Sequence, residues 1–546
     1  MEAVADSLRK EELSRFPEPV IWKFGYGTAG FRDKADRLDR VVFRMGILAG
    51  LRSKCTGATI GVVVTASHNP VEDNGVKVVD PLGEMLAREW EIFANQMANA
   101  SPDELGSVIA EIARTTGLDI TSTGQVACAR DTRPSGKRLL KHLLKGVELT
   151  GVDGRDYGLL TTPQLHYMVR CINTNEAFGV PTEDGYYQKL AMSFKDLLPK
   201  VLPSTAPRVR LDGANGVGAD KARKLVQVIQ ATAGNIIDIE VFNDGTSGTL
   251  NENCGADYVK TQQKAPMGME VNQGERCVSF DGDADRIVFF YMDSVQKFHL
   301  LDGDKIATLA AVFIYERLRM LKTDLSLGVV QTAYANGSAT NYLNQSNIPV
   351  VCALTGVKHL HHKAVEYDIG VYFEANGHGT VVFSDQALET FTKAAEDGRL
   401  SEEEKEAGRQ LLALSRLINQ TVGDSLSDML LVEIILMHKG WGCSEWNVMY
   451  TDLPNRQLKV QVKDRMVVKT TDFDRKCTSP EGLQEQIDAL VFQETGGRSF
   501  VRPSGTEDVV RVYAEAEKRA AADKLAVEVA QQVYKLAGGI GGVPCL

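Results

Sequence analysis

Short runs of apolar residues recur along the whole chain, and most of them end in a glycine-rich, polar or acidic turn. They predict single strands at 58–66, 125–132 and 207–218, and strand pairs around a loop at 274–291 and 370–384. Helical patterns separate these strands. Because strands alternate with helices, the sequence predicts an α/β fold.

The last third of the chain has a different pattern. Residues 386–424 are helical in pattern and densely charged at their centre, which favours helices with a solvated face. The stretch KGWGCSEWN (439–447) contains two glycines and predicts a hinge. Beyond it we expect a small α+β unit that closes with a helix over 520–539. The apolar side of that helix is formed by Leu525, Val529, Val533 and Leu536.

Composition narrows the class of protein. A chain of 546 residues predicts three to four domains at roughly 100–200 residues per domain. The net charge of -11 argues against binding to nucleic acid or an anionic membrane, so any phosphate site must be built locally. Nine scattered cysteines without a Cys-x-x-Cys pair fit reduced thiols. The charged N-terminal residues and the lack of any apolar stretch of about 18 residues lead us to expect a cytoplasmic protein.

The stretch VVVTASHNPVEDNGVK (62–77) places a lone serine, Ser67, just after a strand. His68 lies beside it, and Asn69-Pro70 forms a rigid corner because proline fixes its own φ and restricts the residue before it. Lys77 follows ten residues after Ser67. A serine hydroxyl is a poor nucleophile unless something activates it, so this loop needs a chemical explanation.

The most explicit chemistry lies in the loop DGDADR. Asp281, Asp283 and Asp285 alternate, and in an extended segment they would point to one side. Three carboxylates repel one another unless a hard cation lies among them, which favours Mg²⁺ over a solvated acidic turn. An EF-hand is excluded because Arg286 replaces the required glycine and Met292 the required glutamate.

Two further loops carry polar groups. In RPSGTED, Arg502 offers a bidentate fork, Ser504, Gly505 and Thr506 offer backbone N–H groups, and Arg511 follows, which suits a phosphate as well as an ordinary turn. In FEANGHGT, Glu374, Asn376 and His378 alternate like ligands of sugar hydroxyls, although the pattern by itself favours a loop capped by its own polar side chains.

Two other patterns favour structural explanations. The glycines of LDGANGVG (211–218) have the spacing G-x-x-G-x-G, which is not the dinucleotide fingerprint and indicates a structural turn. His359, His361 and His362 lie among lysines without the spacing of a metal site, so we expect no metal there.

Together these loops resemble those of the α-D-phosphohexomutase family over nearly the whole chain. The counterparts of its phosphoserine, metal, sugar and phosphate loops are, in that order, TASHNP (65–70), DGDADR (281–286), FEANGHG (373–379) and RPSGTE (502–507). Further counterparts of the family's motifs are GTAGFR (27–32), ARDTRPSG (129–136) and GLLTTPQL (158–165).

Two departures from the common family pattern resemble its eukaryotic phosphoacetylglucosamine mutase branch. The serine loop precedes ARDTRPSG here, whereas the order is reversed in most of the family. The sugar loop has Asn376 where the family usually has serine. The changed order leaves the strand order of the first domain open.

The resemblance implies four domains that line one cleft, three of them mixed α/β and the last a smaller α+β domain. In chain order they carry the phosphoserine, metal, sugar and phosphate loops, and we expect them at 1–180, 181–299, 300–440 and 450–546.

The implied reaction interconverts N-acetylglucosamine 6-phosphate and N-acetylglucosamine 1-phosphate through a phosphoserine enzyme and a 1,6-bisphosphate, and it supplies UDP-N-acetylglucosamine synthesis. Ser67 would carry the phosphoryl group, with Arg32 and Lys77 steadying it and Lys77 or His68 as acid/base. Mg²⁺ would bind Ser67, Asp281, Asp283 and Asp285. The residues implied in substrate binding are Arg286, Thr355, Gly356, Glu374, Asn376, Gly377, His378, Arg502, Ser504, Gly505, Thr506 and Arg511.

Three alternatives stay open. A phosphoglucomutase-type hexose-phosphate mutase would use the same loops. An aspartyl-phosphate transferase also has Asp-x-Asp after a strand, but it would want threonine or valine at Asp285. A non-catalytic phosphosugar-binding protein would not need Ser67 and all three aspartates. We expect a monomer whose only partner is its sugar phosphate.

Overall fold

The computed structural model describes residues 2–17, 22–27, 29–504 and 508–545, and these form two compact units. The first unit comprises Met1–Asp302, Asn376–Val382 and Leu388–Ser444. The second comprises Gly303–Ala375, Phe383–Ala387 and Glu445–Leu546. The predicted hinge stretch, 439–447, contains the boundary between Ser444 and Glu445.

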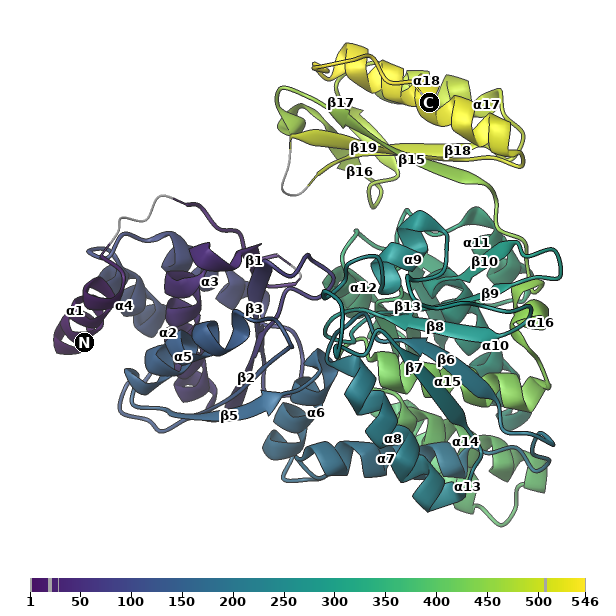
Figure 1. Cartoon of the computed structure of the whole chain (residues 1–546), viewed down its shortest axis with the longest axis horizontal. Helices are drawn as coiled ribbons and strands as arrows, with labels where there is room; N and C mark the ends of the chain where they lie inside the picture. Colours follow the sequence, from purple (N-terminus) through teal and green to yellow (C-terminus); the bar gives the residue numbers. More distant parts are fainter. Residues whose placement is uncertain (1, 18–21, 28, 505–507, 546) are drawn as a thin grey trace. The chain divides into compact units, whose positions relative to one another are not determined.

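The first sheet of the first unit has the order β1-β3-β2-β4-β5 (Figure 1). Strands β2, β4 and β5 are parallel, whereas β3 runs antiparallel to both β2 and β1. The strands are β1 (Phe31–Lys34), β2 (Thr59–Val64), β3 (Asp73–Val79), β4 (Gln125–Arg130) and β5 (Asp153–Leu159). This order answers the question that the rearranged motifs left open: the Ser67 loop joins the antiparallel neighbours β2 and β3, and ARDTRPSG follows on the parallel neighbour β4.

Helices pack on this sheet because its central strands are apolar on both faces; every residue of β2 is buried. Helices α2 and α5 pack on each other, and α6 packs on β2. The helices of this region are α1 (Glu2–Arg15), the 3₁₀ turn η1 (Ala35–Arg37), α2 (Asp39–Thr56), α3 (Arg88–Asn99), α4 (Leu105–Thr116), α5 (Gly136–Glu148) and α6 (Thr162–Asn173).

The second sheet of this unit has the order β10-β9-β8-β6-β7. Strands β6, β7 and β8 are parallel, and β9 turns back antiparallel to β8. The strands are β6 (Arg208–Asp212), β7 (Asp238–Phe242), β8 (Arg276–Phe280), β9 (Ile287–Met292) and β10 (Phe298–Leu301). The neighbouring helices are α7 (Glu183–Asp196), α8 (Gly218–Ala233), α9 (Ala256–Gln262), α14 (Glu402–Leu417) and α15 (Ser425–Lys439).

The second unit contains the parallel strands β12 (Val350–Cys352), β11 (Leu327–Gln331) and β13 (Ile369–Phe373), side by side in that order. Its helices are α10 (Gly303–Leu321), α11 (Gly337–Gln345) and α12 (Val357–Ala364). Three further elements contain a boundary between the units: β14 (Gly379–Phe383), α13 (Asp385–Glu396) and α16 (Cys443–Asn447).

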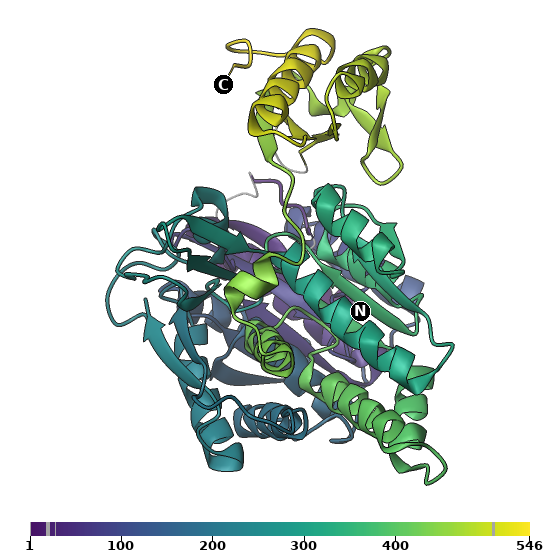
Figure 2. The same ribbon diagram turned by 90° about the vertical axis from the view of Figure 1, so that its right-hand side faces the viewer.

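The end of the chain forms an antiparallel sheet of β15 (Asn455–Gln461), β19 (Val509–Glu515) and β18 (Arg498–Pro503). Helix α18 (Arg519–Leu536) lies along one face of this sheet (Figures 1 and 2). Beside it are the hairpin β16 (Lys469–Thr471) and β17 (Lys476–Ser479), η2 (Arg465–Val467) and α17 (Leu483–Phe492). These elements are the small α+β unit that the sequence predicts.

The apolar side of α18 was predicted one residue too long. Leu525, Val529 and Val533 are fully buried against the sheet, but Leu536 is 39% exposed. Leu536 is the last helical residue, and the core continues past it to the buried Ala537. The charged segment 386–424 is helical as predicted and contains α13 and α14. No helix among the described residues is long and apolar enough to cross a bilayer.

Candidate functional site

Ser67 lies at a strained turn. It follows β2, is fully buried, and has a φ of +53°, a left-handed conformation that a residue with a side chain seldom adopts. Its N–H donates to Thr65 Oγ1 at 2.9 Å, and the N–H of Asn69 donates to the carbonyl of Ala66 at 3.0 Å. Backbone strain of this kind persists where the surroundings hold it and is concentrated at functional sites.

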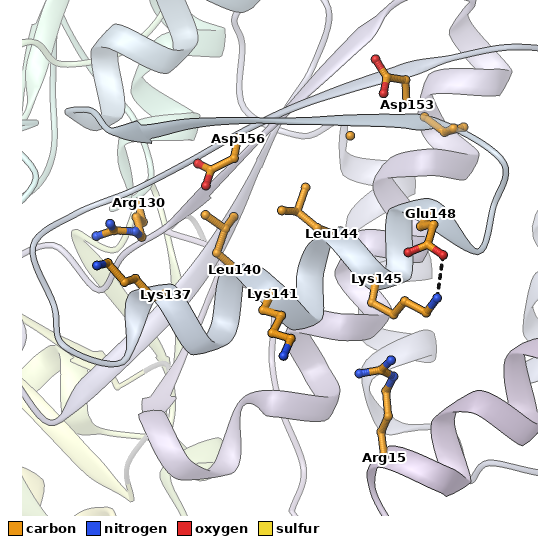
Figure 3. Close-up of a pocket in the computed structure, with 12 residues that line it drawn as sticks. Arg15, Arg130, Lys137, Leu140, Lys141, Leu144, Lys145, Glu148, Asp153 and Asp156 are labelled. Atoms are coloured by element: carbon orange, nitrogen blue, oxygen red, sulfur yellow. Dashed lines mark hydrogen bonds and ion pairs between the residues drawn. The ribbon is translucent and has the colours of Figure 1, made fainter.

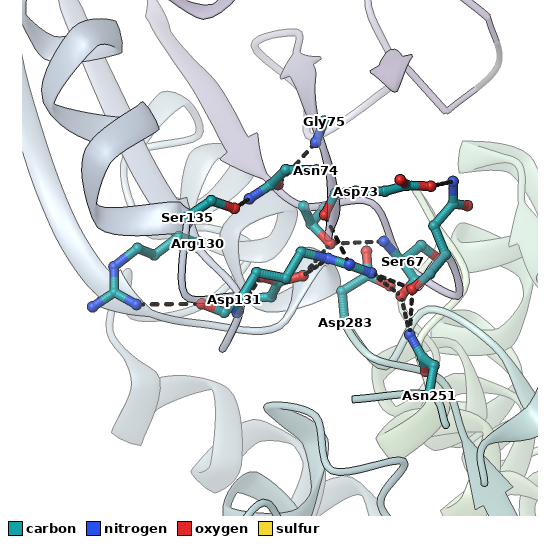
Figure 4. Close-up of polar contacts among 12 residues, drawn as sticks. Ser67, Asp73, Asn74, Gly75, Arg130, Asp131, Ser135, Asn251 and Asp283 are labelled. Atoms are coloured by element: carbon teal, nitrogen blue, oxygen red, sulfur yellow. Dashed lines mark hydrogen bonds and ion pairs between the residues drawn. The ribbon is translucent and has the colours of Figure 1, made fainter. Parts of the chain in front are cut away.

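The guanidinium of Arg133 holds this turn through hydrogen bonds. Its side chain is buried and donates to the carbonyls of Ser67 (2.9 Å), Asn69 (2.8 Å) and Asp73 (2.9 Å), while Nε bonds Asp131 at 3.1 Å. Asn251 adds a further donor, with its Nδ2 2.8 Å from the carbonyl of Ser67 (Figure 4). Because the carbonyls of Ser67 and Asn69 accept hydrogen bonds from neighbouring side chains, the position of Ser67 is set by the protein itself.

The acidic loop lies against Ser67. Asp281, Asp283 and Asp285 are buried, and one oxygen of each lies within 4.8 Å of the others; this is the one such group of potential metal ligands among the described residues. Ser67 Oγ donates to Asp281 Oδ2 at 2.7 Å. A Cβ on Gly282 would lie 2.7 Å from the carbonyl oxygen of Ser67, so only glycine permits this approach.

The geometry of this loop differs from the prediction. We expected an extended segment with three carboxylates on one side, but residues 281–285 form a turn, with Ala284 at a φ of +57°. The carboxylates converge because the chain curls around them. The turn LDGANGVG supports this loop: the N–H of Val217 donates to the carbonyl of Gly282 at 3.1 Å, and α8 begins at Gly218. It is the structural turn that we predicted.

The surroundings shift the pKa values of Lys77 and His68, the two acid/base candidates, in opposite directions. Lys77 Nζ donates to Asp283 Oδ2 at 2.9 Å and to Asp285 Oδ2 at 2.8 Å. Burial lowers the pKa of Lys77, but these two carboxylates outweigh it and raise the pKa. For His68, burial together with the charges of Arg286 and Arg32 lowers the pKa. Lys77 is therefore held as a cation and His68 as a neutral imidazole.

The three aspartates fit a hard divalent cation. Burial and the charges of Asp285 and Asp283 raise the pKa of Asp281, whereas Lys77 and His378 overcome burial and lower the pKa of Asp285. Asp283 Oδ1 is buried without a hydrogen-bond partner. Crowded carboxylates with an unused oxygen are the ligand set that Mg²⁺ prefers in proteins.

The other predicted residues of this unit lie close by. Arg32 Nη1 donates to Asn69 Oδ1 at 3.4 Å, and burial, followed by the charge of Arg286, lowers the pKa of Arg32. Arg286 Nε lies 3.8 Å from Asp281 Oδ2. Thr162, which was not predicted as a site residue, donates from Oγ1 to Asp283 Oδ2 at 2.6 Å.

The sugar loop is held more firmly than the predicted alternation implies. Asn376 Oδ1 accepts from the N–H of His378 at 2.9 Å, and His378 Nδ1 lies 3.3 Å from Asp285 Oδ1. Gly377 has a φ of +84°, and a Cβ there would lie 1.7 Å from the carbonyl oxygen of Ile287. His378 therefore faces the acidic loop, and Asn376 Oδ1 accepts a hydrogen bond from the backbone of its own loop.

The second unit carries the predicted phosphate residues. Arg502 on β18 lies directly opposite Arg511 on β19, and Arg511 lies opposite Lys459 on β15. Like charges on directly opposed residues destabilise a sheet, so this row of three cations favours a bound anion. The N–H of Ser504 donates to the carbonyl of Val509 at 2.9 Å. Two residues of the predicted loop, Gly505 and Thr506, lie outside the described residues.

Three predicted sugar-binding residues also belong to the second unit. Thr355 Oγ1 donates to Asp474 Oδ2 at 3.4 Å. Gly356, with a φ of +124°, immediately precedes α12. Glu374 follows β13 and is partly exposed. Of the three histidines that we set aside, His361 bonds the hydroxyl of Tyr372 at 3.0 Å.

A groove of about 650 Å³ lies between α5 and the edge strand β5 (Figure 3). It is lined by Arg130, Lys137, Lys141, Lys145 and Asp156 among others, and Lys145 pairs with Glu148 at 2.6 Å. Neither Ser67 nor any of the three aspartates lines it. The groove is therefore separate from the Ser67 site.

Family models cover most of the chain. Phosphoacetylglucosamine mutase AMG1, domain II, matches residues 176–288, and domain III of the same family matches 302–441. Phosphoglucomutase/phosphomannomutase, alpha/beta/alpha domain I, matches 50–101 and 93–180, and the C-terminal domain matches 452–532.

Individual relatives match over nearly their whole length. The phosphoacetylglucosamine mutase of Mus musculus is 52% identical over 539 residues, which cover 98% of each protein. A solved structure of Aspergillus fumigatus N-acetylphosphoglucosamine mutase with GlcNAc-6P and magnesium is 47% identical, with a TM-score of 0.92, and the match covers 98% of this chain and 99% of that one. A variant of the same fungal enzyme with glucose 1,6-bisphosphate is 48% identical, with a TM-score of 0.92, and covers 98% and 100%.

Proposed function

The chain belongs to the phosphoacetylglucosamine mutase family of the phosphohexomutases, and we propose that it interconverts N-acetylglucosamine 6-phosphate and N-acetylglucosamine 1-phosphate through phospho-Ser67 and a 1,6-bisphosphate. One observation carries the assignment of Ser67: its Oγ lies 2.7 Å from Asp281 Oδ2, in a buried pocket of three carboxylates. A phosphoryl group on Ser67 would lie beside the cation that this pocket suits. The product feeds UDP-N-acetylglucosamine synthesis.

In the first half of the reaction, phospho-Ser67 transfers its phosphoryl group to the C1 hydroxyl of the 6-phosphate. A P–O bond forms at the sugar oxygen as the bond to Ser67 Oγ breaks. The hydroxyl proton passes to a base and Ser67 Oγ regains a proton. Lys77, held as a cation at the acidic loop, and His68, held as a neutral imidazole, are the two candidates for moving these protons, and Arg32 steadies the phosphoryl group.

In the second half, the bisphosphate presents its 6-phosphate to Ser67 and the same groups act in reverse. When bound by Asp281, Asp283, Asp285 and the phosphorylated Ser67, Mg²⁺ supplies charge neutralisation to the phosphoryl oxygens. His378 and Arg286 hold the acidic loop in place, His378 through its contact with Asp285 and Arg286 through its contact with Asp281.

The second unit holds the phosphate that is not reacting. Arg502 and Arg511, with Ser504, Gly505 and Thr506 of the same loop, would bind it, because the cation row needs an anion. We assign sugar hydroxyls to Thr355, Gly356, Glu374, Asn376 and Gly377. The same loop must bind the 6-phosphate in one half of the reaction and the 1-phosphate in the other, so the sugar binds in two orientations. Contacts based on charge allow both.

The domain division and setting are also proposals. The matched family segments support domains at 1–180, 181–299, 300–440 and 450–546. All nine cysteines are free, which supports a reducing compartment such as the cytoplasm. We propose that the protein acts as a monomer on a small-molecule substrate.

A coupled assay with N-acetylglucosamine 6-phosphate and Mg²⁺ tests the function directly. We expect turnover that EDTA abolishes. Because the fungal relative was solved with glucose 1,6-bisphosphate, glucose 1-phosphate run alongside tests the broader hexose-phosphate activity. Absence of turnover on both substrates would refute the proposed function.

A further inference from the structure

One carboxylate that this mechanism does not use lies among the groups assigned to the distal phosphate. Asp474 is 7% exposed, and its Oδ2 lies 3.2 Å from Nε of Arg502. The same oxygen accepts the hydrogen bond from Thr355 Oγ1. Its other oxygen, Oδ1, accepts from Thr470 Oγ1 at 2.8 Å. A residue assigned to the phosphate and a residue assigned to the sugar therefore share one carboxylate.

The loop that presents Asp474 is strained. Asp472, Phe473 and Asp474 have φ angles of +51°, +57° and +70°, so three successive non-glycine residues are left-handed. Arg475 holds the loop by donating from its N–H to the carbonyl of Asp472 at 3.1 Å and from Nη2 to Asp472 Oδ1 at 2.6 Å. Strain held in this way points to a function for the residue that the loop delivers.

The charges around Asp474 explain what it does. Lys459, Arg511 and Arg502 form a row of like charges across the sheet. Burial raises the pKa of Tyr334. The charges of Arg502 and Arg511 lower this pKa, whereas the charge of Asp474 raises it, so these three charged groups lie near one side chain. Asp474 places a carboxylate at one end of this row, 3.2 Å from Arg502 Nε.

We propose that Asp474 is an internal substitute for the phosphate: its carboxylate holds Arg502 and Thr355 in the free protein, and the non-reacting phosphate of the sugar displaces it. The proposal rests on the function proposed above. Two anions repel each other at one guanidinium, so Asp474 weakens phosphate binding. A bisphosphate that must exchange its two ends within one catalytic cycle gains from a carboxylate that takes back Arg502 each time a phosphate leaves.

Asp474→Asn tests this proposal cleanly. Asparagine keeps the size of the side chain and tolerates the left-handed backbone, and only the charge is removed. We expect the full-length protein to bind inorganic phosphate about five- to tenfold more tightly in calorimetry, since a unit charge several ångströms from a phosphate acts at that level in a solvated site. The KM for the sugar phosphate falls as well, and kcat does not rise because product leaves more slowly.

Asp472→Asn is the matched control. It removes the same charge from the same loop at the same backbone conformation, but Asp472 pairs with Arg475 instead of Arg502. We expect its phosphate affinity to stay at the wild-type level. In an Arg502→Ala background, the gain from Asp474→Asn should disappear, because its contact has gone. Unchanged or weaker phosphate binding by Asp474→Asn overturns the proposal.

The outcomes separate this inference from the proposed function. A wild-type protein without mutase turnover contradicts the function itself. A wild-type protein that turns over, with Asp474→Asn at wild-type KM and phosphate affinity, contradicts only the role of Asp474. A rise in KM would show that Asp474 orients Arg502 for the ligand, which is the opposite of the proposal.

Discussion

The region around Ser67 and the region around Arg502 both manage charge, but in opposite ways. Ser67, Asp281 and Asp283 are fully buried, and neighbouring side chains form hydrogen bonds with each of them. The Arg502 side chain is 24% exposed, and its charge is met by a carboxylate on a strained loop. The first region is an anionic pocket suited to a cation, and the second is a cationic row suited to an anion.

The difference teaches how one protein can fix a reacting group and still release a ligand. In the Ser67 region, buried contacts determine the geometry before any ligand arrives, as phosphoryl transfer demands alignment above all. In the Arg502 region, a partly exposed guanidinium makes weaker contacts that can exchange. Changes in the first region should therefore affect turnover, and changes in the second should affect binding.

The largest effect is expected from Ser67→Ala, which removes the phosphoryl carrier. We expect kcat to fall by roughly a thousandfold or more, as for other nucleophile deletions. Intact-protein mass spectrometry should show a phosphorylated fraction in the wild type that maps to Ser67 and is absent from the variant. A phosphoserine survives acid, whereas an aspartyl phosphate hydrolyses readily in base. Ser193→Ala, at another buried serine, is the control. Wild-type turnover by Ser67→Ala would rule out this carrier.

The next effect concerns the anionic character of the pocket. Asp283→Asn removes one of three carboxylates and weakens the contacts with Lys77 and Thr162. We expect weaker Mg²⁺ binding and a fall in kcat of about a hundredfold. The unfolding temperature should hold or rise, because repulsion between buried carboxylates is relieved. Asp257→Asn, on α9, is the control. Activity that persists in EDTA would contradict the metal assignment.

A smaller effect is expected in the exchangeable region. Arg502→Ala removes a charge-assisted contact of about 1.5–3 kcal/mol, which lowers kcat/KM roughly ten- to hundredfold. Ser67 should still be phosphorylated, because its contacts all lie in the first unit. Lys476→Ala, an exposed cation on β17, is the control. If Arg502→Ala abolishes phosphorylation of Ser67 in a folded protein, the Arg502 region does more than bind the ligand, and the distinction between the two regions is wrong.

The smallest effect probes how tightly the first region is built. Gly282→Ala adds a Cβ 2.7 Å from the carbonyl oxygen of Ser67, so the loop must shift by a few tenths of an ångström. We expect kcat to fall by up to about tenfold, since small misplacements are costly at a reacting centre. Gly398→Ala, where a Cβ meets nothing within 4 Å, is the control. Equal rates for the two variants would show that the pocket is not fixed in advance.

The sequence predicted the elements and loops of the Ser67 region because their signals are local. Short continuous apolar runs mark β2, β8 and β9, and the spacing of Asp281, Asp283 and Asp285 marks the acidic loop. The contacts that hold Ser67 in place could not be predicted from the residues next to it in the sequence. Arg133 reaches the Ser67 turn because β4 lies parallel to β2, a pairing that depends on the whole sheet.

Two side chains show further limits. His378 was predicted as a substrate-binding residue, and its contact with Asp285 at 3.3 Å could not be read from the sequence, because it depends on the close packing of Gly377 on Ile287. Asp474 has no sequence signal at all, because its three left-handed residues include no glycine and its partners Thr355 and Arg502 are distant in the sequence. A pair of aspartates flanking Phe473 in an otherwise charged hairpin reads as an ordinary exposed turn.

The central claim is that the phosphoryl group of Ser67 itself becomes the 1-phosphate of the product. A single-turnover chase tests it most directly. Protein carrying ³²P on Ser67 is mixed with unlabelled N-acetylglucosamine 6-phosphate and Mg²⁺, and the products are separated. The account predicts that the label appears in N-acetylglucosamine 1-phosphate and in the 1,6-bisphosphate, while Ser67 acquires the unlabelled phosphate of the substrate. Label that stays on the protein while the 1-phosphate forms, or that is released only as inorganic phosphate, would contradict the account.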